Sequence, residues 1–405
     1  KIYIYNKMSN SRIILQAVGE QDSYLTKDAK STLFKNKSRR HTLFGQDWSV
    51  INSNYKNSSN FAQPKSKHYF RIENNGDLIN DIYLRMKLKV NSAWRSENFG
   101  VKETILGILD NVNFMCNDKI LSNMGSDYIC SYFELNYDES SKINLIDMMS
   151  YDIIDNSNLG AEETVYVTIP LPLWFHKNPG SAFPMWALNN PNIGINVSIK
   201  DYNNSNREIA DIEILTNFSQ LTKEEKEQFS NKSLEYLIET PEKVSSFSID
   251  QSAVIKKIMI MKTHFIKYFM WNIKDISVNT SNHKYLNDLK SATLSFNGNP
   301  LISDAPGSFY NEVNRFMKFN SCTSLITNLD GSMNESSLNP VYNYSFSMTP
   351  MLKKLSGFLT TEKFNDVAFE FDIKESSITS RQVNLYLVKH NIIRINDGNL
   401  NVLYN

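Results

Sequence analysis

The stretch IYLRMKLKV, residues 82–90, alternates apolar and polar side chains without interruption. One face of the stretch would carry the apolar side chains of Ile82, Leu84, Met86, Leu88 and Val90. The opposite face would carry Tyr83, Arg85, Lys87 and Lys89. Because successive side chains of a strand point to opposite faces of a sheet, this pattern predicts a β-strand with one buried face.

Short runs of the same kind recur on both sides of this stretch, and Asn, Gly, Pro and Ser separate them. Many short strands between turn residues are typical of an all-β sandwich. The further strands that we predict cover residues 164–169, 193–199, 209–216, 245–249, 273–278, 292–296, 342–348, 367–373 and 383–388.

Helical signals are few, and we expect each to be a short helix in a loop. Thr222 and Glu225 have the spacing of a capping box, which predicts a helix running toward Ser230. Ser126 is a candidate cap for a helix through Leu135. Ser308 is a candidate cap for a third helix, which would carry on one face Phe309, Val313, Phe316 and Met317.

The chain of 405 residues exceeds what one hydrophobic core usually holds, so we expect two domains. A polar stretch at residues 201–233 divides two strand-rich halves of similar size. We therefore predict one sandwich at residues 1–215 and a second at residues 216–405, a duplicated architecture joined by a linker with a short helix.

Composition and charge exclude several classes of protein. The 23 Phe and 20 Tyr residues are too many for a disordered chain. Forty-three basic residues balance 43 acidic ones, so we expect no direct nucleic-acid binding. Lysines interrupt the most apolar long stretch, residues 254–271, which argues against a bilayer helix. Three scattered cysteines predict reduced thiols rather than a disulfide framework.

No arrangement of residues in the sequence points to catalysis. The six histidines are isolated, and no metalloprotease, nucleophile-elbow, phosphate-loop or dinucleotide motif is present. We therefore expect no enzyme, no cofactor and no metal site.

Two segments are candidates for contacts between subunits or layers. Residues 169–188 place four prolines among large apolar residues, including Trp174, Phe175 and Trp186. Because prolines cannot occupy the middle of a regular sheet, the segment is either an apolar loop folded into the core or a surface that meets a neighbouring subunit. A basic cluster is either a solvated turn or a bridge to acidic groups of a neighbour or an inner membrane, and it contains Lys35, Arg39 and Arg40.

The N-terminal third carries a specific pattern: GEQDSYLT at residues 19–26, STLFK at 31–35 and RRHTLF at 39–44. This run resembles the opening of the major capsid proteins of nucleocytoplasmic large DNA viruses. Later segments resemble that family in the same order: NGDLI at residues 75–79, a strand followed by a helix at 106–135, IPLPLWF followed by NPG at 169–180, YSFSMTP at 344–350 and LSG at 355–357. Leu355 departs from the family, which usually has Pro there, and the chain's length implies short outward loops.

The resemblance implies a double jelly roll, that is, two eight-stranded antiparallel β-sandwiches in tandem. It also implies a homotrimer whose six sandwiches form a pseudo-hexagonal capsomer of an icosahedral virus shell. The partners would be neighbouring capsomers, minor capsid or penton proteins and, as a further candidate, an inner membrane. The expected location is the virion, after assembly in the host cytoplasm.

Two other functions remain open at this point. A transient scaffold protein of the same fold would form a honeycomb on immature particles and then be shed. A glycan-binding attachment protein would present an exposed aromatic platform, for which Trp94 and Trp271 are candidates.

Overall fold

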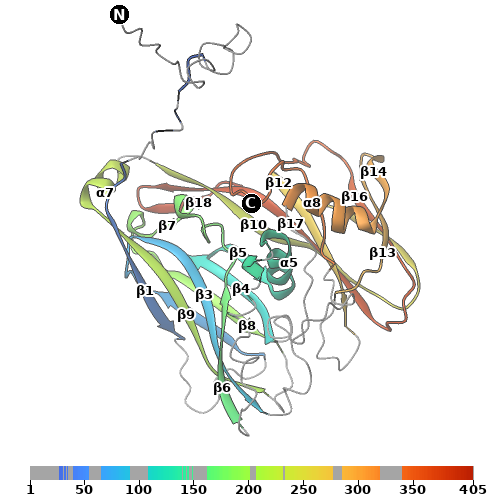
Figure 1. The fold of residues 1–405 in the computed structure, drawn as a ribbon, viewed down its shortest axis with the longest axis horizontal. Coiled ribbons are helices and arrows are strands. Elements are labelled where there is room, and N and C mark those ends of the chain that lie inside the picture. The colour runs from blue at the N-terminus through green and yellow to red at the C-terminus, as the bar shows by residue number, and fades with distance from the viewer. Residues whose placement is uncertain are drawn as a thin grey trace, which may run out of the picture. The chain divides into compact units, whose positions relative to one another are not determined.

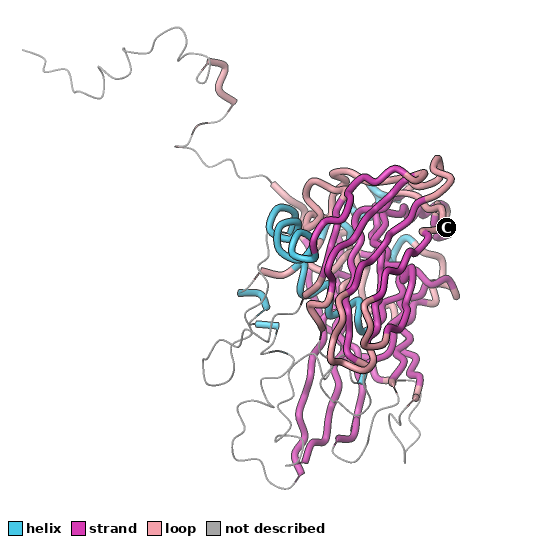
Figure 2. The backbone as a smooth tube through the Cα atoms, turned by 90° about the vertical axis from the view of Figure 1, so that its right-hand side faces the viewer, coloured by secondary structure: helices cyan, strands magenta, loops and turns pink. Residues whose placement is uncertain are grey.

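The computed structural model describes a chain of two compact units, residues 1–43 and residues 44–405. The described residues are 27–30, 32, 34, 40–53, 65–91, 108–138, 140–142, 144–145, 148, 162–200, 207–230, 233–276, 285–319 and 340–404. Nearly all of them belong to the second unit. Figure 2 shows its strands running side by side, with a few short helices.

The first sandwich consists of two antiparallel sheets. The larger sheet has the order β1 (Phe44–Asn52), β9 (Arg207–Leu221), β3 (Leu78–Asn91) and β6 (Glu162–Pro170), and the two-residue strand β7 (Phe183–Pro184) pairs with β3. The smaller sheet has the order β2 (Lys67–Ile72), β8 (Ile193–Ile199), β4 (Leu109–Cys116) and β5 (Lys119–Gly125).

The second sandwich also consists of a larger and a smaller sheet. The larger sheet has the order β10 (Leu234–Ile249), β17 (Arg381–Asn396), β12 (Ile266–Asp275) and β15 (Tyr342–Ser345), and β18 (Asn399–Val402) pairs with β17. The smaller sheet has the order β11 (Val254–Met259), β16 (Val367–Ile373), β13 (Leu289–Phe296) and β14 (Asn299–Pro306).

The two sandwiches share one topology. When the short strands β7 and β18 are set aside, each sandwich has eight described strands, and its larger sheet joins the first, eighth, third and sixth of them. The smaller sheet joins the second, seventh, fourth and fifth. This is the double-sheet jelly-roll arrangement, present twice. The predicted all-β double jelly roll is therefore confirmed (Figure 1).

The alternating stretch at residues 82–90 lies in β3, as predicted, and its inward side chains from Ile82 to Leu88 are fully buried. The second sandwich has its own apolar core around Trp271, whose ring lies 4.9 Å from that of Phe369 and 5.6 Å from that of Phe371. The core of the first sandwich continues into side chains of the second, among them Tyr268 and Met270. The two sandwiches thus have distinct cores and a shared apolar boundary.

Tight turns set the register of two hairpins. Asn297 and Gly298 connect β13 to β14 with φ angles of 48° and 79°. Asp397 and Gly398 connect β17 to β18 with φ angles of 50° and 77°. Two consecutive residues with positive φ form the turn that matches the twist of paired strands, and Gly accepts that conformation without steric cost.

Helices lie in the loops, as predicted, but two of the predicted caps are wrong. Helix α5 (Ser126–Asn136) begins after Gly125, so Ser126 is already helical and its hydroxyl accepts a hydrogen bond from Lys200 instead. The π-turn η3 (Phe309–Val313) leads into α8 (Asn314–Phe319), and Ser308 makes no side-chain capping bond because its backbone is helical. Helix α7 (Lys223–Ser230) follows Thr222, as the capping box predicts.

The predicted boundary between residues 215 and 216 falls inside β9, which continues to Leu221. Because β9 pairs with β1 and β3, and β10 pairs with β17, we propose that the first domain includes all of β9 and that the boundary lies in the α7 segment. Within the described residues, no helix is long and apolar enough to cross a membrane.

Candidate functional site

Helix α5 lies between the two sandwiches and is buried on all sides. Nine of its eleven residues are buried, and its flanks are apolar almost all round, which is the pattern of a helix inside a protein core. The ring of Tyr128 lies 5.9 Å from that of Tyr386 in β17, and α5 also contacts β4 and β5 of its own sandwich. The helix therefore fills the space between the small sheet of the first sandwich and the large sheet of the second.

A row of polar side chains, buried except at its outer end in β10, joins α5 to the second sandwich. Asn272 of β12 donates from Nδ2 to Oγ of Ser131 at 2.9 Å, and Asn384 of β17 donates to Oδ1 of Asn272 at 3.2 Å. Ser246 of β10 completes the row by donating to Asn384 at 2.9 Å. Buried polar groups need such partners, so the row specifies one relative position of the helix and the sheet.

Charged groups reinforce the same junction. Lys274 of β12 lies 3.3 Å from Oδ1 of Asp127 in α5. Arg315 of α8 is buried and donates to the backbone carbonyl of Glu134 at 2.5 Å, while the Glu134 carboxylate also lies 3.3 Å from Nζ of Lys142. Because breaking a buried ion pair leaves an unpaired charge, these contacts oppose any sliding of α8 against α5.

The proline-rich segment at residues 169–188 folds into the core of the first sandwich. Trp174 is 2% exposed and Phe175 is 0% exposed, and both pack edge-to-face on Phe114 of β4 at ring distances of 5.7 and 5.6 Å. Of the three aromatic side chains predicted to touch a neighbour, only Trp186 is partly exposed. Contact with a neighbour stays a prediction, and the burial favours the core alternative for Trp174 and Phe175.

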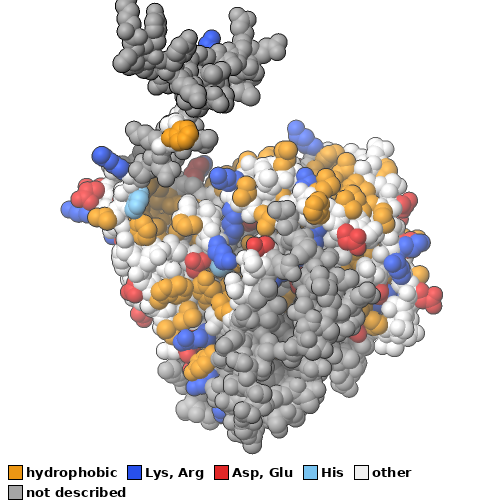
Figure 3. Space-filling view, viewed as in Figure 1, with side chains coloured by type: hydrophobic (Ala, Val, Ile, Leu, Met, Phe, Trp, Pro, Cys, Tyr) orange, Lys and Arg blue, Asp and Glu red, His pale blue; other side chains and the backbone are white. Residues whose placement is uncertain are grey.

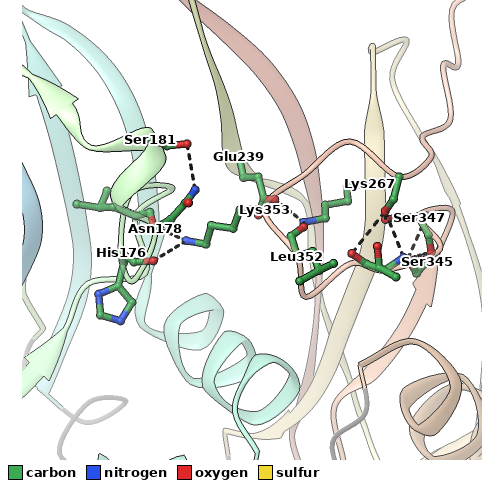
Figure 4. A network of polar contacts seen from close by, with 12 residues as sticks. His176, Asn178, Ser181, Glu239, Lys267, Ser345, Ser347, Leu352 and Lys353 are labelled. Carbon is green, nitrogen blue, oxygen red and sulfur yellow. Dashed lines mark hydrogen bonds and ion pairs between the residues drawn. The ribbon is translucent and has the colours of Figure 1, made fainter. Parts of the chain in front are cut away.

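Lys353, from the segment after β15, holds this proline-rich segment from the other sandwich. Its Nζ donates to the carbonyl of Leu173 at 2.8 Å and to that of His176 at 3.2 Å (Figure 4). Desolvation by burial lowers the pKa of Lys353 to about 8, and the nearby Glu239 carboxylate offsets only part of that effect. Glu239 itself is paired with Lys267 of β12, whose Nζ also reaches the carbonyl of Leu352 at 3.3 Å.

The YSFSMTP stretch at residues 344–350 forms the other end of this network. The amide groups of Phe346 and Ser347 donate to the carbonyl of Lys267 at 3.0 and 3.3 Å, and the Ser345 hydroxyl bonds to Ser347 (Figure 4). The stretch thereby fixes the backbone at Lys267, whose ammonium group pairs with Glu239 of the same sandwich, while Lys353 reaches across the junction. Two of the segments that resemble capsid proteins thus lie at the junction.

His176 is the most constrained histidine of the described residues near this junction. Its Nδ1 lies 2.8 Å from Asp81, and its Nε2 lies 2.9 Å from the Tyr137 hydroxyl. Desolvation by burial lowers the pKa of His176 and outweighs the opposing effect of Asp81. We infer a neutral imidazole that lies between Asp81 and Tyr137 and orients the loop, which is a structural role.

The basic cluster can be followed only in part, because Lys35 and Arg39 lie outside the described residues. Arg40 is exposed, in the unit of residues 1–43. Its role as a bridge to a neighbour or a membrane stays a prediction. Among the described residues, no three His, Cys, Asp or Glu side chains are placed to hold a metal ion.

Among the described residues of the unit 44–405, the exposed apolar side chains include one group on a sheet and one on a helix. The outer face of the larger sheet of the first sandwich carries Trp48, which is 55% exposed, and Val50, which is 50% exposed, together with Tyr166. Helix α8 carries Phe316, 76% exposed, and Met317, 67% exposed. Hydrophobic side chains gather over α8 in the upper right of Figure 3 and over the β1 and β9 sheet at its left.

Exposed apolar patches of this kind mark sites at which a protein contacts other molecules. Sequence reasoning missed the surface on β1, because FGQDWSVIN at residues 44–52 shows only weak alternation. It did find the apolar spacing of Val313, Phe316 and Met317, but that spacing alone could not tell a buried face from an exposed one.

The comparison with known proteins agrees with this architecture. Residues 32–230 match the family model described as "Major capsid protein N-terminus". The chain is 24% identical over 408 residues to the major capsid protein of Pyramimonas orientalis virus, and the match covers 96% of this chain and 98% of that protein.

Solved structures show the same fold. The quasi-atomic model of the PBCV-1 virus capsid superposes with a TM-score of 0.73 at 21% identity, covering 92% of this chain and 100% of the other. The Faustovirus major capsid protein superposes with a TM-score of 0.65 at 10% identity, covering 93% and 94%. At these identities the two structures establish the shared fold alone.

Proposed function

We propose that this chain, which is a double jelly-roll major capsid protein of the large-DNA-virus family, builds its shell as a homotrimer of pseudo-hexagonal outline. The observation that carries the proposal is the repetition of one strand order in two sandwiches of a single chain. Three chains then supply six similar sandwiches to one ring. A ring with threefold symmetry and a nearly sixfold outline can tile a flat facet.

The junction between the sandwiches supports this role. A tile needs two sandwiches at a fixed angle, because a hinge would let neighbouring tiles adopt different outlines. The buried row from Ser131 to Asn384 and the Lys353 contacts are what such a fixed angle requires. A permanent trimer of this kind should bury more than about 2,000 Å² in total, with an apolar centre.

Further partners follow from the same role. We infer contacts with neighbouring capsomers, minor capsid or penton proteins and an inner membrane, with Arg40, Lys35 and Arg39 as candidates for the inner contacts. We also infer assembly in the host cytoplasm, which the free thiol of Cys116 suits.

The glycan-binding alternative loses one of its two candidates, because Trp271 is fully buried in the second core. The relatives named above are capsid proteins, and no described feature favours the scaffold alternative over the shell. A direct test of shell against scaffold is the abundance of the protein in purified mature particles.

The oligomer is tested by native mass spectrometry of the purified protein. The chain has a mass of 46.7 kDa, so a trimer has three times that mass, about 140 kDa. Negative-stain images of the same sample should show particles with a hexagonal outline. A sample that stays monomeric at the concentrations used for assembly would overturn the proposal.

A further inference from the structure

The chain already contains one example of how two of its sandwiches join. Helix α5 connects the fifth and sixth strands of the first sandwich and packs on the outer face of the larger sheet of the second. The side chains of that face around the helix are buried, among them Met270, Asn272 and Tyr386. Within the chain, the two sandwiches are therefore joined by a helix of the first that packs on the large sheet of the second.

The second sandwich has a helical segment at the same topological place. Helix α8, with the preceding η3 turn, connects its fifth strand, β14, to its sixth, β15. One side of α8 faces α5, through Arg315, and Phe319 of α8 packs edge-to-face on Tyr268. The other side projects Val313, Phe316 and Met317, which lie three and four residues apart on one helical stripe.

The first sandwich has a large sheet at the equivalent place, and its outer face is exposed at Trp48 and Val50 and half-buried at Tyr83 and Leu215. Strands β1, β9 and β3 are its first, eighth and third strands, as β10, β17 and β12 are in the second sandwich. Leu215 of β9 is the register partner of both Val50 and Tyr83, so these three side chains form a row across the outer face. Trp48 extends the row, with its ring 5.8 Å from that of Tyr83.

We propose that the apolar stripe of α8 (Val313, Phe316 and Met317) docks on the outer row of the next copy (Trp48, Val50, Tyr83 and Leu215). Helix α8 is topologically equivalent to α5, and the outer row lies on the sheet face equivalent to the one on which α5 packs within the chain. Each copy offers one of each, so the contact is head-to-tail and closes into a ring when three copies join. This inference rests on the proposed homotrimer and assigns its interface.

Single substitutions test the two surfaces separately. Phe316→Asp and Trp48→Asp each place a charge at the centre of one surface, and both should convert the trimer into monomer in native mass spectrometry. Both side chains are more than half exposed in the protomer, so circular dichroism should stay unchanged. Met261→Asp is the matched control, because Met261 is 76% exposed in the connection between β11 and β12, outside both surfaces, and should leave the trimer intact.

Mixing the two variants tests the head-to-tail pairing. The Trp48→Asp chain keeps an intact α8 and the Phe316→Asp chain keeps an intact outer row, so the mixture should yield a dimer that cannot grow, about 93 kDa or twice 46.7 kDa. Neither variant should form that dimer by itself. A symmetric contact, in which both copies use the same surface, would not give a dimer that forms only in the mixture.

The outcomes separate this inference from the proposed function. A trimeric wild type whose Phe316→Asp and Trp48→Asp variants also remain trimeric would overturn the interface and leave the homotrimer standing. Two monomeric variants that give no mixed dimer at high protein concentration would overturn the pairing of these surfaces. A monomeric wild type would overturn the homotrimer itself.

Discussion

Lys353 shows how one partly buried charge joins the two sandwiches and how that contact responds to pH. Burial lowers its pKa from 10.5 to about 8 in the folded protein, so between pH 8 and 10.5 the unfolded chain binds more protons. The unfolding free energy therefore rises with pH through that window. Comparison of the wild type with Lys353→Met isolates this effect, because other groups titrate alike in both. We expect the unfolding free energy of the wild type to rise by about 1–2 kcal/mol relative to that of Lys353→Met between pH 7.5 and pH 9.5.

Urea unfolding at several pH values measures the difference. Lys354→Met is a suitable control, since Lys354 is the neighbouring lysine and its side chain is exposed. A difference between wild type and Lys353→Met that stays constant across the pH range would contradict the placement of the Lys353 ammonium group in the junction.

At the residue scale, the sequence identified several important segments, but it did not show which residues pack against them. It marked Trp174 and Phe175 as unusual, because prolines surround them, but it could not distinguish a core from a contact surface. That distinction depends on Phe114, about 60 residues earlier in the chain, which packs on both rings. The Lys353 contacts were not predictable, since two adjacent lysines between Leu352 and Leu355 give no sign of which one reaches the other sandwich.

At the scale of elements, α5 and its polar row are the features on which the angle between the sandwiches depends. Asn272→Leu removes one acceptor and one donor and leaves the Ser131 hydroxyl and the Asn384 amide without these partners. Each buried group left unpaired costs about 1–3 kcal/mol, so we expect a loss of about 2–4 kcal/mol in the unfolding free energy. Asn123→Leu, at an exposed position in β5, should change it by less than about 0.5 kcal/mol.

Chemical denaturation at neutral pH tests this pair of substitutions. Equal stabilities of Asn272→Leu and the wild type would mean that the row contributes no net stability, and that apolar packing alone positions α5. In that case Ser131→Ala should also leave the unfolding free energy unchanged.

Strands with a clean alternation were predicted well, and those without it were missed. The predicted strands at residues 193–199 and 367–373 have the bounds of β8 and β16. The predicted strand at residues 342–348 ends at Ser345, because the following residues turn back onto Lys267. The alternation did not predict strands β1, β2, β4, β5, β7, β11, β14 and β18. In β1 and β14 most side chains are exposed, so no apolar period appears in the sequence.

For the whole molecule, the shared apolar boundary should make the two sandwiches unfold together. Tyr268 and Met270 of the second sandwich belong to the first core, and α5 is covered only when both sandwiches are folded. Loss of either sandwich would therefore expose a large apolar surface of the other, at about 25 cal/mol per Å². We expect residues 44–405 to melt in a single calorimetric transition, with equal calorimetric and van't Hoff enthalpies. The Phe316→Asp monomer is the proper sample, since subunit dissociation cannot then add a second step. Two resolved transitions would show that the sandwiches unfold independently and that the junction does not fix their angle.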